Sequence, residues 1–193
     1  MKYCCYCSAE LIYDIPSNDN RHRYICKACG IIHYQNPKIV AGCIPVWGDQ
    51  ILLCRRAIEP RLGYWTLPAG FMEMGESTLE AGIRETFEEA NARIEVEDLY
   101  AVFNLSHVDQ VYMIYRSRLL DLDFSPGVES SEVKLFEEDE IPWDGLAFTA
   151  IKETLKFYLD DKKTGKFQLH TGDIIKNENY YEFIETKILK NEE

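Results

Sequence analysis

The segment Gly70–Glu89 reads GFMEMGESTLEAGIRETFEE and carries the most informative pattern in the chain. We expect a helix from about Ser77 to Asn91, because Ser77 and Glu80 have the spacing of a capping box at a helix start. Residues three and four apart share one face of a helix, so this helix presents several carboxylates together. They are Glu85, Glu88 and Glu89. Like charges at this spacing repel unless a cation lies between them, and Mg²⁺, which prefers oxygen ligands, is the natural occupant. The alternative, and the usual one for glutamates at helical spacing, is a solvated acidic face.

Patterns on both sides of this segment predict an α+β sandwich. Two strands joined at a Gly48-Asp49 turn precede it, and longer strands and a second helix follow it. The expected strands are 38–47, 50–56, about 95–105, about 111–120 and 133–136, with a helix at about 146–160 and a last strand at 165–170. An apolar stripe on the second helix, typical of core packing, consists of Phe148, Ile151, Leu155, Tyr158 and Leu159. We expect three parts, at 1–36, 37–161 and, as a C-terminal extension, 162–193.

The first part contains two cysteine pairs, Cys4-x-x-Cys7 and Cys26-x-x-Cys29. Their spacing is that of two zinc knuckles, each of which supplies two thiolates to one tetrahedral Zn²⁺. Four protein ligands leave no open position for water, so the zinc is expected to be structural. The alternatives are a redox pair, free thiols, or a ligand set shifted by one residue to Cys5.

Composition excludes several classes of protein. The chain has 193 residues, is 46% hydrophobic and carries a formal net charge of −12. Its apolar content is sufficient for a buried core, but no apolar run approaches the ~18 residues of a membrane helix. The acidic balance argues against a nucleic-acid-binding protein, because such proteins gain affinity from Lys and Arg. The seven unevenly placed cysteines and the lack of a signal-peptide pattern lead us to expect a reducing, cytoplasmic location.

The segment resembles the Nudix box, written G-x5-E-x7-R-E-U-x-E-E-x-G-U with U an aliphatic residue. The matching positions are Gly70, Glu76, Arg84, Glu85, Glu88 and Glu89. Thr86 and Ala92 replace aliphatic residues, and Asn91 replaces the last glycine. Asn tolerates the left-handed backbone that a helix end requires, so none of these changes removes a carboxylate. The resemblance implies a Nudix α/β/α sandwich with a mixed sheet, preceded by a small zinc ribbon.

The same resemblance implies a role for each box residue. The ligands of Mg²⁺ or Mn²⁺ would be Glu85, Glu88, Glu89 and the backbone carbonyl of Gly70. Arg84 would brace the carboxylates through an ion pair, and Glu76 would anchor the loop to the helix. Nudix enzymes cleave a nucleoside diphosphate linked to a second group, by attack of water on phosphorus. Metal ions serve such a reaction by neutralising the pyrophosphate and lowering the pKa of the water.

Residues outside the box are weaker candidates. A separate carboxylate often serves as the base in this family, and SPGVESSEV at 125–133 contains Glu129 and Glu132, of which we favour Glu132. The alternative for either is a solvated loop residue. Candidate substrate-binding residues, all with a surface role as the alternative, are Arg55, Arg56, Arg61 and Tyr64. The arginines could reach phosphate oxygens. Tyr64 could stack on a flat ring, as could Tyr34, Phe103 and Tyr112, with a place in the core as the alternative for these aromatic residues.

Several further segments resemble the plant plastid FAD pyrophosphatases and their bacterial relatives. They are YQNPK (34–38), LLCRR (52–56), WTLPAGFMEMGES (65–77), RETFEEANA (84–92), SPGVES (125–130) and IPWDGLAF (141–148). This resemblance implies hydrolysis of FAD to FMN and AMP, with ADP-ribose as a secondary substrate. NADH pyrophosphatases also join a zinc ribbon to a Nudix domain, but LYAVFNLSHVDQ (99–110) stands where their SQPWPFPxS signature would be.

Two alternatives to FAD hydrolysis stay open. One is an NADH or ADP-ribose pyrophosphatase with the same chemistry. The other is a nucleotide-sensing or nucleic-acid-binding protein that keeps the Nudix fold without hydrolysis. The intact glutamates favour the enzyme, because a sensor need not keep three metal carboxylates. Nudix proteins are often dimers, so a homodimer is an expectation, although no segment specifies an interface.

Overall fold

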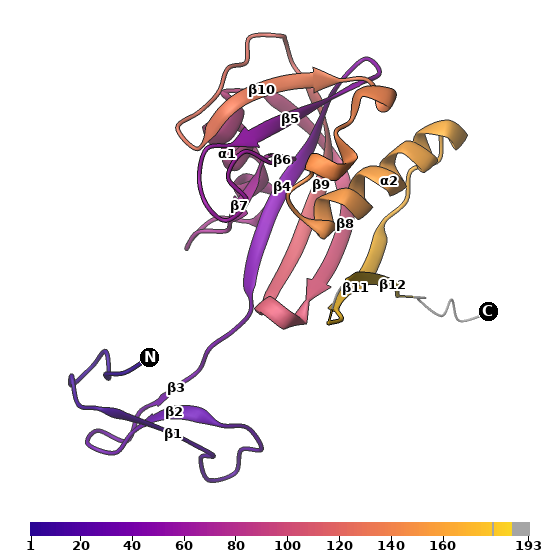
Figure 1. Cartoon of the computed structure of the whole chain (residues 1–193). Coiled ribbons are helices and arrows are strands. Elements are labelled where there is room, and N and C mark those ends of the chain that lie inside the picture. The colour runs from indigo at the N-terminus through magenta and orange to yellow at the C-terminus, as the bar shows by residue number, and fades with distance from the viewer. Residues whose placement is uncertain (179, 187–193) are drawn as a thin grey trace. The chain divides into compact units, whose positions relative to one another are not determined.

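The structure is a computed structural model that describes residues 1–178 and 180–186. The chain forms two compact units, Met1–Pro37 and Lys38–Glu193. The first contains a small sheet, and the second contains a larger sheet and two helices (Figure 1). Within the described residues, every helix is too short or too polar to cross a membrane.

The N-terminal unit is a three-stranded antiparallel sheet in the order β1-β2-β3. Its strands are β1 (Leu11–Asp14), β2 (Arg23–Cys26) and β3 (Ile32–His33). Each cysteine pair lies in a tight turn that ends in a left-handed residue, Ser8 with φ 61° and Gly30 with φ 76°. The N–H of Ser8 donates to the Cys4 carbonyl at 2.9 Å, and that of Gly30 to the Cys26 carbonyl at 2.8 Å. The two turns therefore have the same hydrogen-bonded form.

The second unit is built on a nine-stranded mixed sheet. Its strands are β4 (Lys38–Trp47), β5 (Gln50–Arg56), β6 (Trp65–Thr66), β7 (Ala69–Phe71), β8 (Ile94–Leu105), β9 (Gln110–Leu119), β10 (Ser130–Phe136), β11 (His170–Lys176) and β12 (Tyr181–Glu185). The order is β10-β5-β4-β9-β8-β11-β12, with β6 beside β5 and β7 beside β4. The pairs β4–β9 and β8–β11 are parallel, and the other pairs are antiparallel.

Two helices, α1 (Thr78–Ala90) and α2 (Thr149–Thr164), cover opposite faces of this sheet. On β4, the Cys43 sulfur packs against Gly82 of α1, whereas Ile44 belongs to the core cluster that contains Ile151 of α2. Successive strand residues point to opposite faces, so the two helices form separate layers of an α/β/α sandwich. The described part of the chain also contains the 3₁₀ helices Ser106–Val108, Glu138–Glu140 and Trp143–Gly145.

The structure confirms the α+β class with a mixed sheet and two helices, and β4 and β5 have the predicted bounds. The expected helix start near Leu146 is wrong, because a 3₁₀ turn ends at Gly145 and α2 begins after Phe148. The expected strand at 165–170 is also wrong. Gly165, with φ 68°, ends α2, and the strand begins only at His170.

The described C-terminal residues, up to 186, continue the second unit. Residue 162, where we expected an extension to begin, lies inside α2. Strand β11 pairs in parallel with β8 and thereby joins the main sheet. Residues 179 and 187–193 of the expected extension lie outside the described residues.

Candidate active site

Local signals fix both ends of α1, the helix that carries the candidate carboxylates. Ser77 Oγ accepts a hydrogen bond from the Glu80 N–H at 3.2 Å, and the Glu80 carboxylate accepts one from the Ser77 N–H at 2.8 Å. This reciprocal pair is a capping box. At the other end Asn91 is left-handed with φ 49°, and its N–H donates to the Phe87 carbonyl at 2.7 Å. Asn91 thus takes the backbone conformation for which a glycine is usual.

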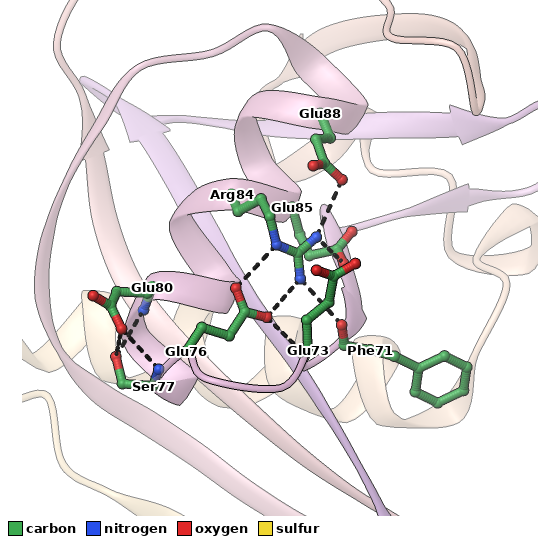
Figure 2. Close-up of polar contacts among 8 residues, drawn as sticks. All are labelled: Phe71, Glu73, Glu76, Ser77, Glu80, Arg84, Glu85 and Glu88. Carbon is green, nitrogen blue, oxygen red and sulfur yellow. Dashed lines mark hydrogen bonds and ion pairs between the residues drawn. The ribbon is translucent and has the colours of Figure 1, made fainter.

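Arg84 is the centre of the polar contacts before and along α1 (Figure 2). Its guanidinium forms a bidentate pair with Glu76, at 3.0 Å from Nε and 2.8 Å from Nη2. It also donates to Glu85 at 2.7 Å, to Glu88 at 3.1 Å and to the Phe71 carbonyl at 3.1 Å. The hydrogen bonds from Arg84 hold the pKa of Glu76 down to about 2. Arg84 therefore fastens the preceding loop to the carboxylate face of α1.

Glu89 is the buried carboxylate of the set, with only 7% of its surface exposed. One of its oxygens accepts a hydrogen bond from the Ala69 N–H at 3.2 Å. Burial raises the pKa of Glu89 to about 8, and the charges of Glu85 and Glu129 act in the same direction. The ionised form of this cluster is therefore costly in the absence of a cation.

Gly70 provides the space that the Glu85 carboxylate occupies. Gly70 lies on β7 and pairs with Ala41 of β4, and a Cβ at position 70 would overlap the Glu85 carboxylate. A side chain here would push Glu85 away from β7, so the close approach requires glycine. Burial raises the pKa of Glu85 as well, although the ion pair with Arg84 opposes this effect.

A cavity of about 770 Å³ opens beside these carboxylates. Its acidic lining consists of Glu59, Glu73, Glu85, Glu88, Glu89 and Glu129. Its larger apolar and aromatic side chains are Val40, Ile58, Pro60, Phe71, Met72, Tyr112, Val128 and Phe148. Two arginines, Arg56 and Arg84, and one amide, Gln110, also line it. Such a cavity suits a ligand with both charged and flat apolar parts.

The oxygen donors on α1 fit a hard divalent cation, since Mg²⁺ and Mn²⁺ prefer carboxylate and carbonyl oxygens. Within the described residues, however, these carboxylates do not converge on one point. Glu88 turns to Arg84 and Glu89 turns to the Ala69 N–H. Binding a cation would require Glu88 to leave Arg84. Its side chain is 57% exposed and has room to do so.

The loop before β10 places Glu129 in the cavity wall. Gly127 packs on the end of α1 so closely that a Cβ there would overlap the Glu88 carbonyl oxygen. The Gly127 N–H donates to the Glu89 carbonyl at 3.0 Å. This contact fixes the loop against α1, two residues before Glu129.

Glu132, the favoured base in the sequence analysis, does not line the cavity. It lies on β10, half exposed, and pairs with Arg55 at 3.5 Å. The pairing of β10 with β5 is irregular between Ser130 and Glu132, so the strand does not keep a simple alternation there. Sequence spacing does not reveal such an irregularity.

Among the four candidates Arg55, Arg56, Arg61 and Tyr64, the structure places Arg56 alone in the cavity lining. It is buried, its Nε donates to the Pro60 carbonyl at 2.8 Å, and its guanidinium lies 5.2 Å from the centre of the Phe148 ring. Its positive charge acts on Glu89 and lowers the pKa of that carboxyl. Arg56 is thus a cation held beside the carboxylates.

The other three predicted substrate-binding residues lie outside the cavity lining. Arg55 donates to the Gly63 carbonyl at 3.0 Å. Arg61 lies over the Tyr64 ring, 5.6 Å from its centre. These contacts give all three a role in the loop that joins β5 to β6.

Sequence reasoning missed Gln110 and most of the apolar lining, including Phe71 and Phe148, but Tyr112, one of the aromatic residues considered for ring stacking, does line the cavity. Phe148 was expected in the core stripe of α2, but it precedes the helix and lies between the core and the cavity. Phe71 directly follows Gly70 of the Nudix box, and its place beside that glycine is the one sequence feature that could have identified it. Gln110 carries no local signal at all.

The sulfurs of four cysteines in the N-terminal unit lie within 4.8 Å of one another: Cys4, Cys7, Cys26 and Cys29. The Cys4–Cys29 and Cys7–Cys26 sulfur distances are 3.7 and 3.4 Å. A tetrahedral Zn²⁺ with metal–sulfur bonds of about 2.3 Å separates its sulfurs by about 3.8 Å. The cluster therefore fits a structural zinc. Cys5 lies outside it, with its sulfur 3.8 Å from His33 Nδ1.

An α/β/α sandwich whose first helix presents braced carboxylates to a cavity is an arrangement suited to hydrolysis of a diphosphate bond with a divalent cation. The chain belongs to the Nudix family, because the NUDIX domain profile matches residues 36–161. The zinc-ribbon profile described as Nudix N-terminal matches residues 2–35. Membership makes the chain a Nudix hydrolase and implies a divalent cation and a nucleoside diphosphate linked to a second group as the substrate class.

Relatives with known structures or names support this assignment. A NUDIX hydrolase from Nitrosomonas europaea is 54% identical and superposes with a TM-score of 0.89, covering 91% of this chain and 100% of that one. An ADP-ribose pyrophosphatase of Methanocaldococcus jannaschii is 26% identical over 113 residues, 56% of this chain and 67% of the relative. The NAD-capped RNA hydrolase NudC of Photorhabdus laumondii is 34% identical over 96 residues, 48% of this chain but only 34% of the relative.

Proposed function

We propose that this protein is a Mg²⁺-dependent dinucleotide pyrophosphatase that prefers FAD and hydrolyses it to FMN and AMP. The observation that carries the pyrophosphatase assignment is the set of α1 carboxylates on the wall of a cavity of about 770 Å³. The aromatic and apolar lining of that cavity supports a substrate with flat rings. The resemblance of segments such as 65–77 and 141–148 to FAD pyrophosphatases supports the flavin.

The metal would be held by Glu85, Glu88, Glu89 and the Gly70 carbonyl. When bound, Mg²⁺ or Mn²⁺ neutralises the diphosphate oxygens and lowers the pKa of the attacking water. The chain itself supplies position and charge. Arg84 holds Glu85 at the cavity wall, at 2.7 Å, whereas Glu88 would leave its 3.1 Å contact with Arg84 to reach the metal. The close packing of Gly70 against Glu85 fixes the carboxylate relative to β7.

Glu129 is the group we propose as the proton acceptor. It lies in the cavity wall, whereas Glu132 is paired with Arg55. Glu129 would take the proton of the attacking water as the new phosphorus–oxygen bond forms and the bridging oxygen leaves. Arg56, buried in the same wall, would neutralise a diphosphate oxygen.

ADP-ribose is the second candidate substrate, and the name of the Methanocaldococcus relative favours it. ADP-ribose and FAD share the adenosine diphosphate half and differ in the group on the second phosphate. The chemistry and the roles of the α1 residues are the same for both. Only the part of the cavity that receives the second group distinguishes them.

Product analysis with a panel of FAD, NADH, ADP-ribose and Ap4A in Mg²⁺ tests this proposal. We expect FMN and AMP from FAD at the highest rate of the four. Faster cleavage of NADH or ADP-ribose would support the pyrophosphatase activity and exclude FAD as the preferred substrate. No turnover of any member, with Mg²⁺ or Mn²⁺, would contradict the enzyme and favour a nucleotide-sensing protein.

A further inference from the structure

One part of the cavity wall is a row of residues on three neighbouring strands. Phe71 of β7 pairs with Val40 of β4, which in turn pairs with Tyr112 of β9. Paired residues on neighbouring strands point to the same face of a sheet, and all three line the cavity. We call Phe71, Val40 and Tyr112 the ring platform, because an aromatic ring stands at each end of an apolar row.

Gln110 lies at the edge of the ring platform. It precedes Tyr112 by two residues on β9, so its side chain lies on the same face of the sheet. It is half buried and lines the cavity, where it is the one amide side chain among the described residues. Within those residues no hydrogen bond engages its amide group, which leaves a donor and an acceptor for a ligand.

The ring platform adjoins the carboxylates. Phe71 directly follows Gly70, and its carbonyl accepts a hydrogen bond from Arg84 at 3.1 Å. Its ring points away from the Arg84 contacts (Figure 2). A diphosphate at the α1 carboxylates would therefore leave one of its nucleoside groups within reach of the platform.

We propose that the ring platform holds the adenine of the substrate and that Gln110 reads its edge. This inference rests on the proposed function and names the half of the dinucleotide that this wall recognises. An amide side chain matches adenine because it can accept from the N6 amino group and donate to N7 at once. Adenine is also the part that FAD, NADH and ADP-ribose have in common. Recognition here would select adenosine diphosphate compounds as a class.

Binding of AMP and IMP, measured by calorimetry in Mg²⁺, tests the proposal without hydrolysis. Hypoxanthine carries an oxygen in place of the N6 amino group and cannot donate to the Gln110 oxygen. We expect the wild type to bind AMP roughly tenfold or more tightly than IMP. Gln110→Ala should abolish the preference by weakening AMP binding, with the IMP affinity little changed. Gln168→Ala, an exposed glutamine outside the cavity, is the matched control and should keep the preference.

Equal binding of AMP and IMP by the wild type, or an unchanged preference in Gln110→Ala, would overturn the inference. Kinetics add a second test, in which Gln110→Ala should raise KM for FAD and for ADP-ribose by the same factor. A rise in KM for FAD alone would indicate that the isoalloxazine, and not adenine, binds the ring platform, and would contradict the proposal. An AMP preference in a protein that hydrolyses no dinucleotide would support the inference and contradict the proposed function.

Discussion

Glu76 and Glu89 show how neighbouring glutamates acquire opposite properties. Glu76 accepts two hydrogen bonds from Arg84, which lower its pKa to about 2. Glu89 is buried beside other carboxylates, which raises its pKa to about 8. The first residue is a permanent anion that orders a loop. The second is an anion only when a cation or high pH stabilises its charge.

The raised pKa of Glu89 predicts how the stability of the metal-free protein depends on pH. The pKa of Glu89 in the folded protein, about 8, lies above the ordinary glutamate value of 4.5, so between these pH values the folded state binds a proton that the unfolded state has lost. Stability should therefore fall as the pH rises from 5 to 8, by a few kcal/mol at about 1.4 kcal/mol per pKa unit. Glu89→Gln should remove this loss, because glutamine stays neutral.

Urea unfolding in a chelator at pH 5 and pH 8 measures the effect. Glu88→Gln is the matched control, because the Glu88 side chain is 57% exposed, and it should keep the wild-type pH dependence. If the free energy of unfolding changes equally with pH in the wild type and in Glu89→Gln, burial does not raise the pKa of the Glu89 carboxyl.

Glu129 and Glu132 give a second prediction at the residue scale. Glu129→Gln should lower kcat by about 10²-fold or more, the usual contribution of a general base. Glu132→Gln should keep most of the activity, because Glu132 faces Arg55 and not the cavity. Steady-state kinetics of both variants with the best substrate decide between them. The reverse order of effects would restore Glu132 as the base.

At the scale of elements, the loop before β10 depends on its packing against α1. Gly127→Ala should destabilise the fold by about 1–3 kcal/mol, because its Cβ would overlap the Glu88 carbonyl oxygen. Activity should fall as well, since Glu129 follows two residues later. Gly145→Ala is the control, because a Cβ there would make an ordinary contact of 3.6 Å with Pro142. Equal stability of the two variants would contradict the close packing.

The two cysteine turns of the N-terminal unit predict its metal content. Cys26→Ser should lose the zinc and unfold the small sheet, because Cys26 is fully buried in the four-sulfur cluster. Cys5→Ser should keep one zinc per chain, because Cys5 lies outside that cluster. Metal analysis of both purified variants, with circular dichroism, checks this. Zinc retained by Cys26→Ser would require a different ligand set.

For the whole molecule, the sequence predicted those helices and strands whose ends are marked by local capping or turn residues. The capping box and Asn91 marked α1, and the Gly48-Asp49 turn marked the β4–β5 hairpin. The spacing of the four cysteines likewise indicated their cluster. Each of these patterns consists of short motifs of a few residues, so the sequence alone is sufficient to recognise it.

The walls of the cavity could not be predicted in this way. Gln110 reaches the site because β9 pairs in parallel with β4, about seventy residues earlier in the chain, and the same pairing places Tyr112, which its aromatic ring alone had made a candidate. The joining of β11 to β8 was missed for the same reason. Glu132 was favoured over Glu129 on the resemblance to the family, whereas the position of Glu129 depends on how Gly127 packs on α1. Contacts between distant segments leave no local pattern in the sequence.

The central claim is that the α1 carboxylates, with a divalent cation, hydrolyse the diphosphate bond of a dinucleotide. Phosphorus NMR of FAD and ADP-ribose mixed with the wild type or with Glu88→Gln tests it most directly, in Mg²⁺ and in a chelator. We expect monophosphate signals to replace the diphosphate signals only with the wild type and Mg²⁺, and the rate to fall by orders of magnitude in Glu88→Gln. Hydrolysis in the chelator, or an undiminished rate in a folded Glu88→Gln, would contradict the account.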